Sequence, residues 1–329
     1  VDGFRCDMAH MVPVEFWKWA IARARRRNAE VMFIAEAYDN DPMKVESGNI
    51  LTALLDAGFD AVYDDPAYKT LKRIYDGPAW ANDLDGTLAA QDTRVFQNSL
   101  RYAENHDEVR LASKGNWGGV GMDAGRAVSA ILFGISRGPV LLYSGQEVGE
   151  PANGAEGFGG DDGRTTIFDY WCMPEFAKWV NGHRYDGARL SPRPRELREV
   201  YGRLLKLVGE PAFRDGAFHP LNPHNIHNPD YGRVPREPAS GHWLYSYVRA
   251  DSKGTDCCLV VVNLHAAHTF ENVHIEIPQS VRDSFAPGDH ILRDRLGSLP
   301  SITVAAGSNS VTIPRIPPLT PAYFQRALA

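Results

Sequence analysis

The sequence contains few cysteines, no long apolar run and no excess of positive charge. Its four cysteines, Cys6, Cys172, Cys257 and Cys258, lack the spacing of metal-ligand pairs, so we predict neither a metal site nor a disulfide framework. The apolar runs are much shorter than a membrane span, so no membrane partner is expected. The net charge of −6 comes without the clustered Lys and Arg that follow a phosphate backbone, so no nucleic-acid partner is expected either.

The first two thirds of the chain alternate between short apolar segments and amphipathic ones. Apolar segments at 31–35, 61–63 and 140–143 read as strands, and helical periodicity covers residues near 13–24 and 196–208. Continuous apolar strands separated by helices are typical of a parallel sheet that is buried on both faces. The sequence therefore predicts α/β architecture over residues 1–215.

The character of the sequence changes after that region. Residues 216–240 are rich in Pro, Asn and His and are predicted to be a loop or linker without regular structure. Strand patterns then follow at short intervals, near 242–248, 258–263, 273–277 and 310–313, with Gly and Pro between them. This pattern predicts an all-β antiparallel sandwich domain over residues 241–329.

Three carboxylates follow predicted strands in the first domain. Asp7 and Glu36 are separated by about one β/α unit of thirty residues, and Asp107 lies two strands further along the chain. In a β/α barrel the carboxyl ends of the strands meet at one face, so we expect the three side chains to share one mouth. Cleaving a glycosidic bond with retention requires such a set, because one carboxylate attacks the anomeric carbon while another carboxyl group protonates the leaving oxygen. Arg5 points to the same face as Asp7 and would keep it ionised.

Four segments resemble the α-amylase family of glycoside hydrolases, glycoside hydrolase family 13. Residues 3–10, 34–37 and 105–107 are similar to its second, third and fourth signature regions, and residues 138–147 to its eighth strand and following loop. The resemblance implies a (β/α)8 TIM barrel, N-terminally truncated with strands 4–8 present, followed by the β domain of that family. It implies action on α-glucosidic bonds of starch- or glycogen-type glucans or maltooligosaccharides.

The resemblance also implies roles for particular residues. Asp7 corresponds to the nucleophile, Glu36 to the general acid/base and Asp107 to the carboxylate that stabilises the transition state. Substrate-binding roles fall to Arg5, His10, Tyr38, His106 and Arg110. No cofactor is required for this chemistry, and a structural calcium would be bound mostly by a segment that precedes Val1 in the family.

Each of these residues also has a purely structural interpretation. Arg5 and Asp7 can form an ion pair, Glu36 can simply end a strand, and residues 105–107 can cap a helix. His10, Tyr38 and Arg110 can satisfy loop groups, and Trp117 can either stack on a sugar or cover the barrel rim. An α-glucan transglycosylase or branching-type enzyme remains the alternative activity. An inactive carbohydrate-binding or scaffold subunit is the alternative of another class.

The sequence departs from the family pattern at its start. The first signature region and the domain inserted after the third strand have no counterpart, so we expect a longer enzyme of which this chain is the C-terminal part, with the preceding barrel segment as its partner. A parallel barrel missing three strands would have two open edges. The sequence yields no prediction of localisation.

Overall fold

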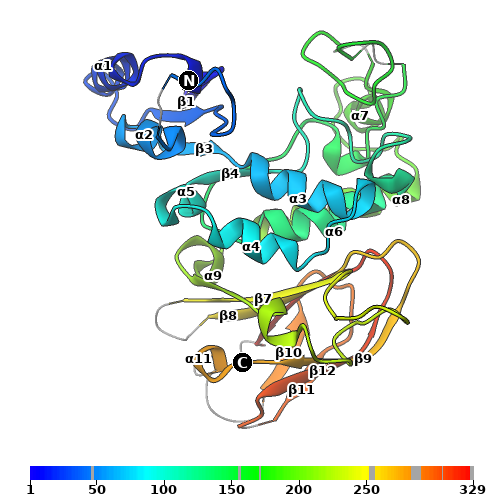
Figure 1. Cartoon of the computed structure of the whole chain (residues 1–329). Coiled ribbons are helices and arrows are strands. Elements are labelled where there is room, and N and C mark those ends of the chain that lie inside the picture. Colours follow the sequence, from blue (N-terminus) through cyan, green and yellow to red (C-terminus); the bar gives the residue numbers. More distant parts are fainter. Residues whose placement is uncertain are drawn as a thin grey trace.

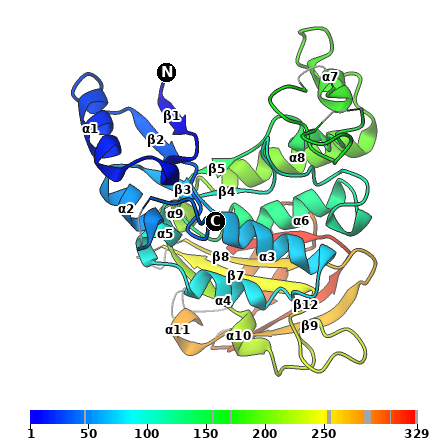
Figure 2. The ribbon, with the colours of Figure 1, turned by 45° about the horizontal axis from the view of Figure 1, so that its top comes forward.

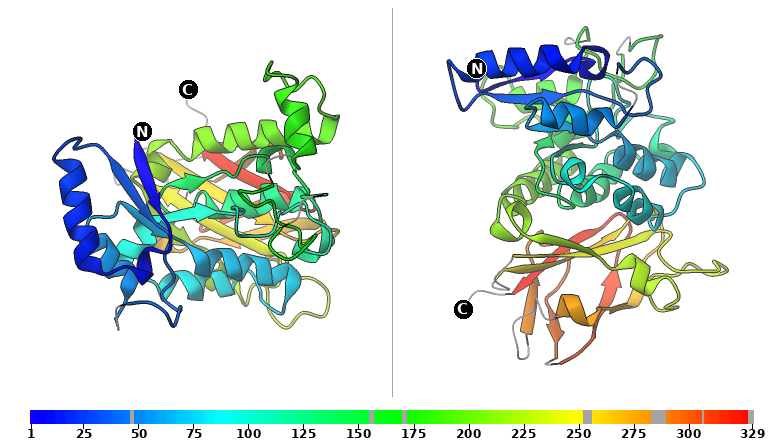
Figure 3. Two further views of the ribbon diagram at one scale, coloured as in Figure 1. Left: turned by 90° about the horizontal axis from the view of Figure 1, so that it is seen from above. Right: turned by 60° about the vertical axis from the view of Figure 1, so that its left-hand side comes forward.

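The computed structural model describes residues 1–45, 48–154, 157–169, 172–251, 256–282, 290–305 and 307–326 of the 329-residue chain. A parallel sheet and its helices lie above an antiparallel β domain (Figure 1). Figure 3 shows the same arrangement from the side as three tiers, with the N-terminal strands and helices at one end and the β domain at the other. Within the described residues no helix is long and apolar enough to cross a membrane.

Five parallel strands form the first sheet in the order of the sequence. They are β1 (Gly3–Cys6), β2 (Met32–Ala35), β3 (Ala61–Tyr63), β4 (Ser99–Tyr102) and β5 (Val140–Leu141). Each strand pairs in parallel with the next. The strands β3 and β4 are buried along their whole length. The β3 side chains are apolar or aromatic, whereas β4 includes Arg101, whose buried guanidinium pairs with the Asp64 carboxylate. The predicted α/β barrel architecture is thereby confirmed as a curled five-stranded part of a barrel.

Helices connect the strands and cover the sheet. They are α1 (Val14–Arg25), α2 (Ile50–Asp56), α3 (Asp65–Asp76), α4 (Asp83–Ala89), α5 (Thr93–Gln97), α6 (Asp123–Leu132), α7 (Pro174–Val180), α8 (Pro192–Leu207) and α9 (Pro211–Arg214). Short 3-10 helices occur at η1 (Ala9–Met11), η2 (Trp117–Gly119) and η3 (Gln146–Val148). The helix α3 begins where the sequence provides a cap, because the Asp64 carboxylate accepts a hydrogen bond from the Ala67 amide at 3.4 Å.

The β domain consists of two antiparallel sheets. The larger has the order β11-β10-β13-β8-β7-β6, and β12 pairs with β9 in the smaller. The strands are β6 (Ala217–Pro220), β7 (Leu244–Ala250), β8 (Cys257–Asn263), β9 (Phe270–Glu276), β10 (His290–Asp294), β11 (Ile302–Val304), β12 (Ser310–Ile316) and β13 (Pro321–Arg326). Apolar side chains from both sheets share one core, so the predicted sandwich is confirmed.

The region expected to be an unstructured linker contains regular structure. The strand β6 pairs with β7, and the short helix α10 (Asn222–Asn225) follows it. The expectation of no regular structure is therefore wrong at these residues. Pro220 is tolerated because β6 lies at the edge of its sheet, and Pro223 sits in the first turn of α10, where a missing N–H costs nothing. The proposed domain boundaries stay a prediction.

The two parts of the molecule share an apolar core. One face of the larger β sheet packs on α4 and α6, and side chains from both sides join a single cluster. Figure 1 shows β7 and β8 beneath α4 and α6, and in the view of Figure 2 the two strands lie between the labels of α6 and α4. Within that interface the Tyr245 hydroxyl donates a hydrogen bond to Asp85 Oδ1 at 2.7 Å. Asp85 Oδ2 is buried and has no hydrogen-bond partner among the described residues.

Asp85 makes the stability of this interface depend on pH. Burial raises the pKa of Asp85 from 3.8 to about 7, and the hydrogen bond from Tyr245 offsets only part of that shift. The pKa of Asp85 is higher in the folded state than in the unfolded state. The protonated Asp85 therefore leaves the folded protein at full stability below pH 4, and this stability is lost as the pH rises to about 7.

Replacing Asp85 by Asn is therefore expected to stabilise the protein at pH 8 and to have little effect at pH 4. The gain should be on the order of 2–4 kcal/mol, since one pKa unit corresponds to about 1.4 kcal/mol. Urea unfolding at a series of pH values measures it. The exposed Asp230 provides the control variant, Asp230→Asn, and a gain that does not change with pH would contradict the assignment.

Candidate active site

The carboxyl ends of β1, β2 and β4 meet at one cavity of about 440 Å³, which we call the catalytic cavity. Asp7 follows β1 directly, Glu36 follows β2 directly, and Asp107 lies in the loop after β4. All three line the cavity. Tyr38 and His106 line it too. The spacing argument is therefore correct in placing the three carboxylates at one mouth.

Arg5 is the centre of this group. Its guanidinium hydrogen-bonds Asp7 through Nη1, and its Nη2 lies 3.0 Å from Glu36 Oε2 and 3.8 Å from Asp107 Oδ2. Burial by itself lowers the pKa of Arg5, but the hydrogen bonds with Tyr63 and Asp7 raise it above its usual value. One cation thus contacts all three carboxylates and weakens the repulsion among them.

Glu36 is held more firmly than the other two carboxylates. It is 3% exposed, whereas the Asp7 side chain is 76% exposed. Glu36 Oε2 accepts a hydrogen bond from the Met8 amide at 2.7 Å, and Oε1 accepts one from the Tyr38 hydroxyl at 3.2 Å. The Met8 backbone has a positive φ of 41°, and this turn after β1 is what aims its amide at Glu36. The exposed Asp7 can reach a substrate, while Glu36 is fixed in one orientation.

His106 and Asp107 line the catalytic cavity from the loop after β4. His106 Nε2 lies 3.0 Å from Asp107 Oδ2. The Asn105 side chain accepts hydrogen bonds from the amides of Asp107 at 2.8 Å and Glu108 at 3.0 Å. This turn fixes the backbone of Asp107 while leaving its carboxylate directed at the cavity. The helix-cap interpretation of residues 105–107 does not apply, because no helix begins there.

Two residues predicted to bind substrate, Arg110 and His10, are buried in the structure, and their substrate-binding role stays a prediction. Arg110 is fully buried, with Nη1 2.8 Å from Glu104 Oε2 and Nη2 donating to the Ser144 carbonyl at 3.0 Å. His10 is also fully buried, and its Nε2 lies 3.0 Å from Asp41 Oδ2. The Arg110 guanidinium is a buried charge, and the Glu104 carboxylate supplies its partner. Neither side chain lines the catalytic cavity.

Trp117 is a core residue. Its side chain is completely buried and packs edge-on against Tyr68 and Tyr75, at ring distances of 5.8 and 6.0 Å. Both expectations for it, a sugar platform and an exposed cover of the barrel rim, are therefore wrong. The sequence could not reveal this, because a Trp between glycines looks like a mobile loop residue.

Sequence reasoning missed the apolar wall of the catalytic cavity. Phe158, Ile167 and Phe168 line it from the long loop after β5 and are 56%, 64% and 65% exposed. Aromatic rings beside carboxylates suit a sugar, which has an apolar face and a hydroxyl edge. The one available signal was Phe158 itself, an aromatic residue flanked by glycines at 157, 159 and 160.

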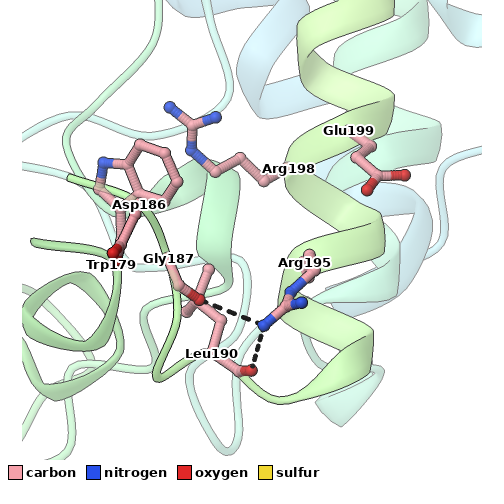
Figure 4. A pocket seen from close by; sticks show the side chains of 7 residues that line it. All are labelled: Trp179, Asp186, Gly187, Leu190, Arg195, Arg198 and Glu199. Atoms are coloured by element: carbon pink, nitrogen blue, oxygen red, sulfur yellow. Dashed lines mark hydrogen bonds between the residues drawn. The ribbon is translucent and has the colours of Figure 1, made fainter. Parts of the chain in front are cut away.

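A separate cavity of about 250 Å³ lies between the α7 region and α8 and contains none of the predicted site residues. Figure 4 shows Arg195 directing its guanidinium at the carbonyls of Gly187 and Leu190, to which Nη2 donates hydrogen bonds at 3.3 and 3.2 Å. Arg198 stacks on the Trp179 ring, 3.4 Å from its centroid. These contacts hold the segment that contains Trp179, Gly187 and Leu190 against α8.

Within the described residues no group of three or more His, Cys, Asp or Glu side chains is placed to hold a metal ion. A structural calcium therefore stays a prediction from the resemblance alone. In the part of the chain that the structure describes, Cys6, Cys257 and Cys258 form no disulfide with one another.

Comparisons with known proteins give a consistent result. Alpha-amylase MalA of Haloarcula japonica is 32% identical over 156 residues, which is 46% of this chain and 20% of MalA. A maltosyltransferase of Cereibacter sphaeroides, named alpha-1,4-glucan:maltose-1-phosphate maltosyltransferase, is 25% identical over 285 residues, 84% of this chain and 34% of that protein. The chain is therefore similar in sequence to enzymes of the α-amylase family. No family model matches it.

Solved structures support the same fold. The alpha-amylase of Geobacillus thermoleovorans in complex with acarbose matches 99% of this chain with a TM-score of 0.63 and 17% identity. The cyclomaltodextrin glucanotransferase CldA matches 100% of it with a TM-score of 0.68 and 17% identity. The chain spans 60% and 57% of those two structures and a fifth of MalA.

Proposed function

We propose that this site cleaves α-glucosidic bonds of starch- or glycogen-type glucans or maltooligosaccharides with retention of configuration. The observation that carries the proposal is the contact of one arginine, Arg5, with three carboxylates at a single cavity. A cation within a carboxylate cluster favours an ionised carboxylate, as a nucleophile must be, and weakens the repulsion that would keep the carboxylates apart. A solvated ion pair on the surface would not require one arginine to contact three carboxylates.

The proposed mechanism assigns one task to each carboxylate. Asp7, the most exposed, attacks the anomeric carbon and forms a covalent glycosyl intermediate, while Glu36 gives its proton to the leaving oxygen. Glu36 then removes a proton from the incoming water, which attacks the same carbon and releases Asp7. Asp107 and His106 bind sugar hydroxyls as positive charge develops on the ring. The apolar wall of Phe158, Ile167 and Phe168 covers the face of a sugar.

Transfer to a second sugar is the other candidate activity. It is favoured by the match to the maltosyltransferase over 84% of the chain and by the fold of CldA. Transfer shares every step up to the glycosyl intermediate and differs only in the nucleophile that breaks it down. Hydrolysis and transfer therefore require the same roles of Asp7, Glu36 and Asp107, and these residues do not distinguish the two activities.

Product analysis with maltopentaose tests both activities in the full-length protein. For hydrolysis we expect shorter products only, one new reducing end for each bond cleaved, and the α-anomer as the first product by NMR, because two inversions restore the starting configuration. Products longer than maltopentaose without new reducing ends would assign transfer. A β-anomer formed first would contradict the retaining mechanism.

An inactive glucan-binding subunit would give neither result. It would bind maltopentaose in a calorimeter without any product. The presence of Arg5 together with all three carboxylates argues against this alternative, because binding alone requires no such charge arrangement.

A further inference from the structure

The long loop after β5 contains a short turn that carries Phe158, one of the three side chains in the apolar wall of the catalytic cavity. Glycines stand at positions 157, 159 and 160, and glycine gives the backbone more freedom than any other residue. Phe158 is also 56% exposed, so burial does little to fix its ring. Other contacts must hold this side chain beside the carboxylates, because a freely moving ring would lose conformational entropy whenever a ligand bound.

Asp162 closes the turn around Phe158. Its Oδ2 accepts a hydrogen bond from the Phe158 amide at 3.2 Å, and its Oδ1 accepts one from the Arg164 amide at 3.1 Å. Burial by itself raises the pKa of Asp162, but these two amides and the Arg164 guanidinium together lower it below its usual value. The turn is therefore built around a carboxylate that is ionised at neutral pH.

The backbone of the turn fits around this carboxylate because position 157 is a glycine. Gly157 has a positive φ of 59°, which side chains of other residues disfavour. A Cβ atom there would collide with the Asp162 carboxylate and would lie 2.7 Å from the Gly160 carbonyl oxygen. The turn thus has a defined shape although glycines flank Phe158.

Arg164 connects Asp162 to the ring itself. Its Nη1 donates a hydrogen bond to Asp162 Oδ2 at 2.8 Å, and its guanidinium carbon lies 5.6 Å from the centroid of the Phe158 ring. That distance is within the range of a cation–π contact. Arg164 is not among the described residues that line the catalytic cavity. We therefore expect it to affect a bound sugar through the Phe158 ring rather than by direct contact.

The other end of the turn is tied to the loop that carries Asp107. The Arg110 amide donates a hydrogen bond to the Gly163 carbonyl at 2.8 Å, and Arg110 Nε donates one to Thr165 Oγ1 at 3.2 Å. The Tyr143 hydroxyl donates a hydrogen bond to the Thr165 carbonyl at 2.6 Å. Thr165 is 1% exposed, so water does not compete for these bonds. The turn and the loop after β4 therefore have a common fixed base.

We propose that Asp162 and Arg164 are positioning residues that hold Phe158 against the catalytic cavity and thereby set the affinity of the site for a sugar. The inference rests on the proposed function, because it takes an α-glucan as the ligand of the catalytic cavity. It adds two residues that act on the substrate only through a third. A ring that is already in place can bind the apolar face of a sugar without first being ordered.

Binding and turnover of maltopentaose by the full-length protein test the inference. Phe158→Ala is expected to raise Kd and KM about tenfold through the lost ring contact, with kcat within about twofold, because an apolar wall binds ground state and transition state alike. Arg164→Met and Asp162→Ala should each raise Kd and KM about fourfold with the same small effect on kcat. Calorimetry in a Glu36→Gln background measures Kd without turnover.

A double variant distinguishes positioning from an independent structural effect. If Arg164 acts through Phe158, then Phe158→Ala combined with Arg164→Met should bind maltopentaose no more weakly than Phe158→Ala alone. Additive losses would overturn the inference, because they would show that Arg164 acts by another route. Gly157→Ala changes no charge and should reproduce the loss seen with Arg164→Met. The exposed Arg189→Met, in the segment after α7, is the control and should leave Kd and kcat unchanged.

The readouts separate the two levels of the proposal. A protein that binds maltopentaose without cleaving or transferring it would contradict the proposed function, while the Kd values of the variants would still decide this inference. An unchanged Kd in both Arg164→Met and Asp162→Ala would overturn the inference and leave the roles of the three carboxylates in place. No binding of maltopentaose by the unmodified protein would overturn both. Gly157→Ala keeps the test decisive should Arg164→Met or Asp162→Ala disturb folding.

Discussion

Replacing Asp7 by Asn in the full-length protein is expected to lower kcat on maltooligosaccharides by about three to five orders of magnitude, because an amide cannot form the glycosyl intermediate. Glu36→Gln and Asp107→Asn should cause losses of similar size through failed proton transfer and lost stabilisation of the transition state. Steady-state kinetics with maltopentaose measures all three. Asp2→Asn, at the opposite end of β1, is the matched control.

Chemical rescue distinguishes the nucleophile from the acid/base. With Asp7→Ala, azide can attack the sugar from the vacated face, and we expect a β-glycosyl azide. With Glu36→Ala, Asp7 still forms the intermediate, so azide attacking it should yield the α-glycosyl azide. An activated substrate such as α-maltosyl fluoride is needed for both reactions. The same anomer from both variants would refute the division of roles, and near-normal turnover in any variant would remove that residue from the site.

Arg5 explains why these losses should not be additive. Its guanidinium contacts Asp7 and Glu36 and lies 3.8 Å from Asp107 Oδ2, so the removal of one carboxylate changes the field at the other two. When several residues act together in one catalytic step, the first substitution already removes most of the enzyme's activity. A double variant, Asp7→Asn with Asp107→Asn, is therefore expected to be little slower than Asp7→Asn alone.

Replacing Arg249 by Met is expected to destabilise the folded protein by about 3–5 kcal/mol. Arg249 is fully buried in β7 and donates hydrogen bonds to four backbone carbonyls, those of Ile135 at 3.0 Å, Ala212 at 3.2 Å, Phe213 at 2.6 Å and Gly216 at 2.8 Å. Without the guanidinium these buried acceptors lose their donor, at about 1–3 kcal/mol for each one left unsatisfied. Removing the buried charge offsets part of the loss.

The effect should appear in urea or thermal unfolding followed by circular dichroism. Burial lowers the pKa of Arg249 to about 10, so the side chain remains charged at neutral pH and its four contacts persist there. Arg249→Lys should give an intermediate loss, because a single ammonium cannot reach four divergent carbonyls. Arg293→Met on the exposed side of β10 is the control. A change below 1 kcal/mol for Arg249→Met would show that water replaces the guanidinium.

The arrangement of the three carboxylates could be predicted from the sequence. Asp7 and Glu36 are separated by about one β/α unit, which places them on neighbouring strands. One more strand, at residues 61–63, lies between Glu36 and the strand that precedes Asp107. The chain direction of a parallel sheet then forces the strand ends to one face, so local pattern and topology lead to the same conclusion. The antiparallel sandwich was equally visible, because its strands alternate with Gly and Pro turns.

The identity of the side chains around the carboxylates could not be predicted in the same way. Arg110 and His10 lie close to signature residues in the sequence, yet both side chains are buried. Arg110 binds Glu104 and the Ser144 carbonyl, and His10 contacts Asp41. No sequence motif identifies these partners. Trp117 lies in a glycine-rich loop but packs on α3. Burial depends on which elements approach one another, and sequence neighbours do not record that.

The sequence by itself determined the order of the strands, the positions of Asp7, Glu36 and Asp107 at their ends, and the change to an antiparallel domain, because these depend on periodicity and spacing along the chain. The tertiary structure alone decided that Arg5 contacts all three carboxylates, that the loop after β5 supplies an apolar wall, and that Asp39 and Asp65 line one cavity between β2 and β3. Those features depend on contacts between segments far apart in the chain, whose distances are set only when the elements pack.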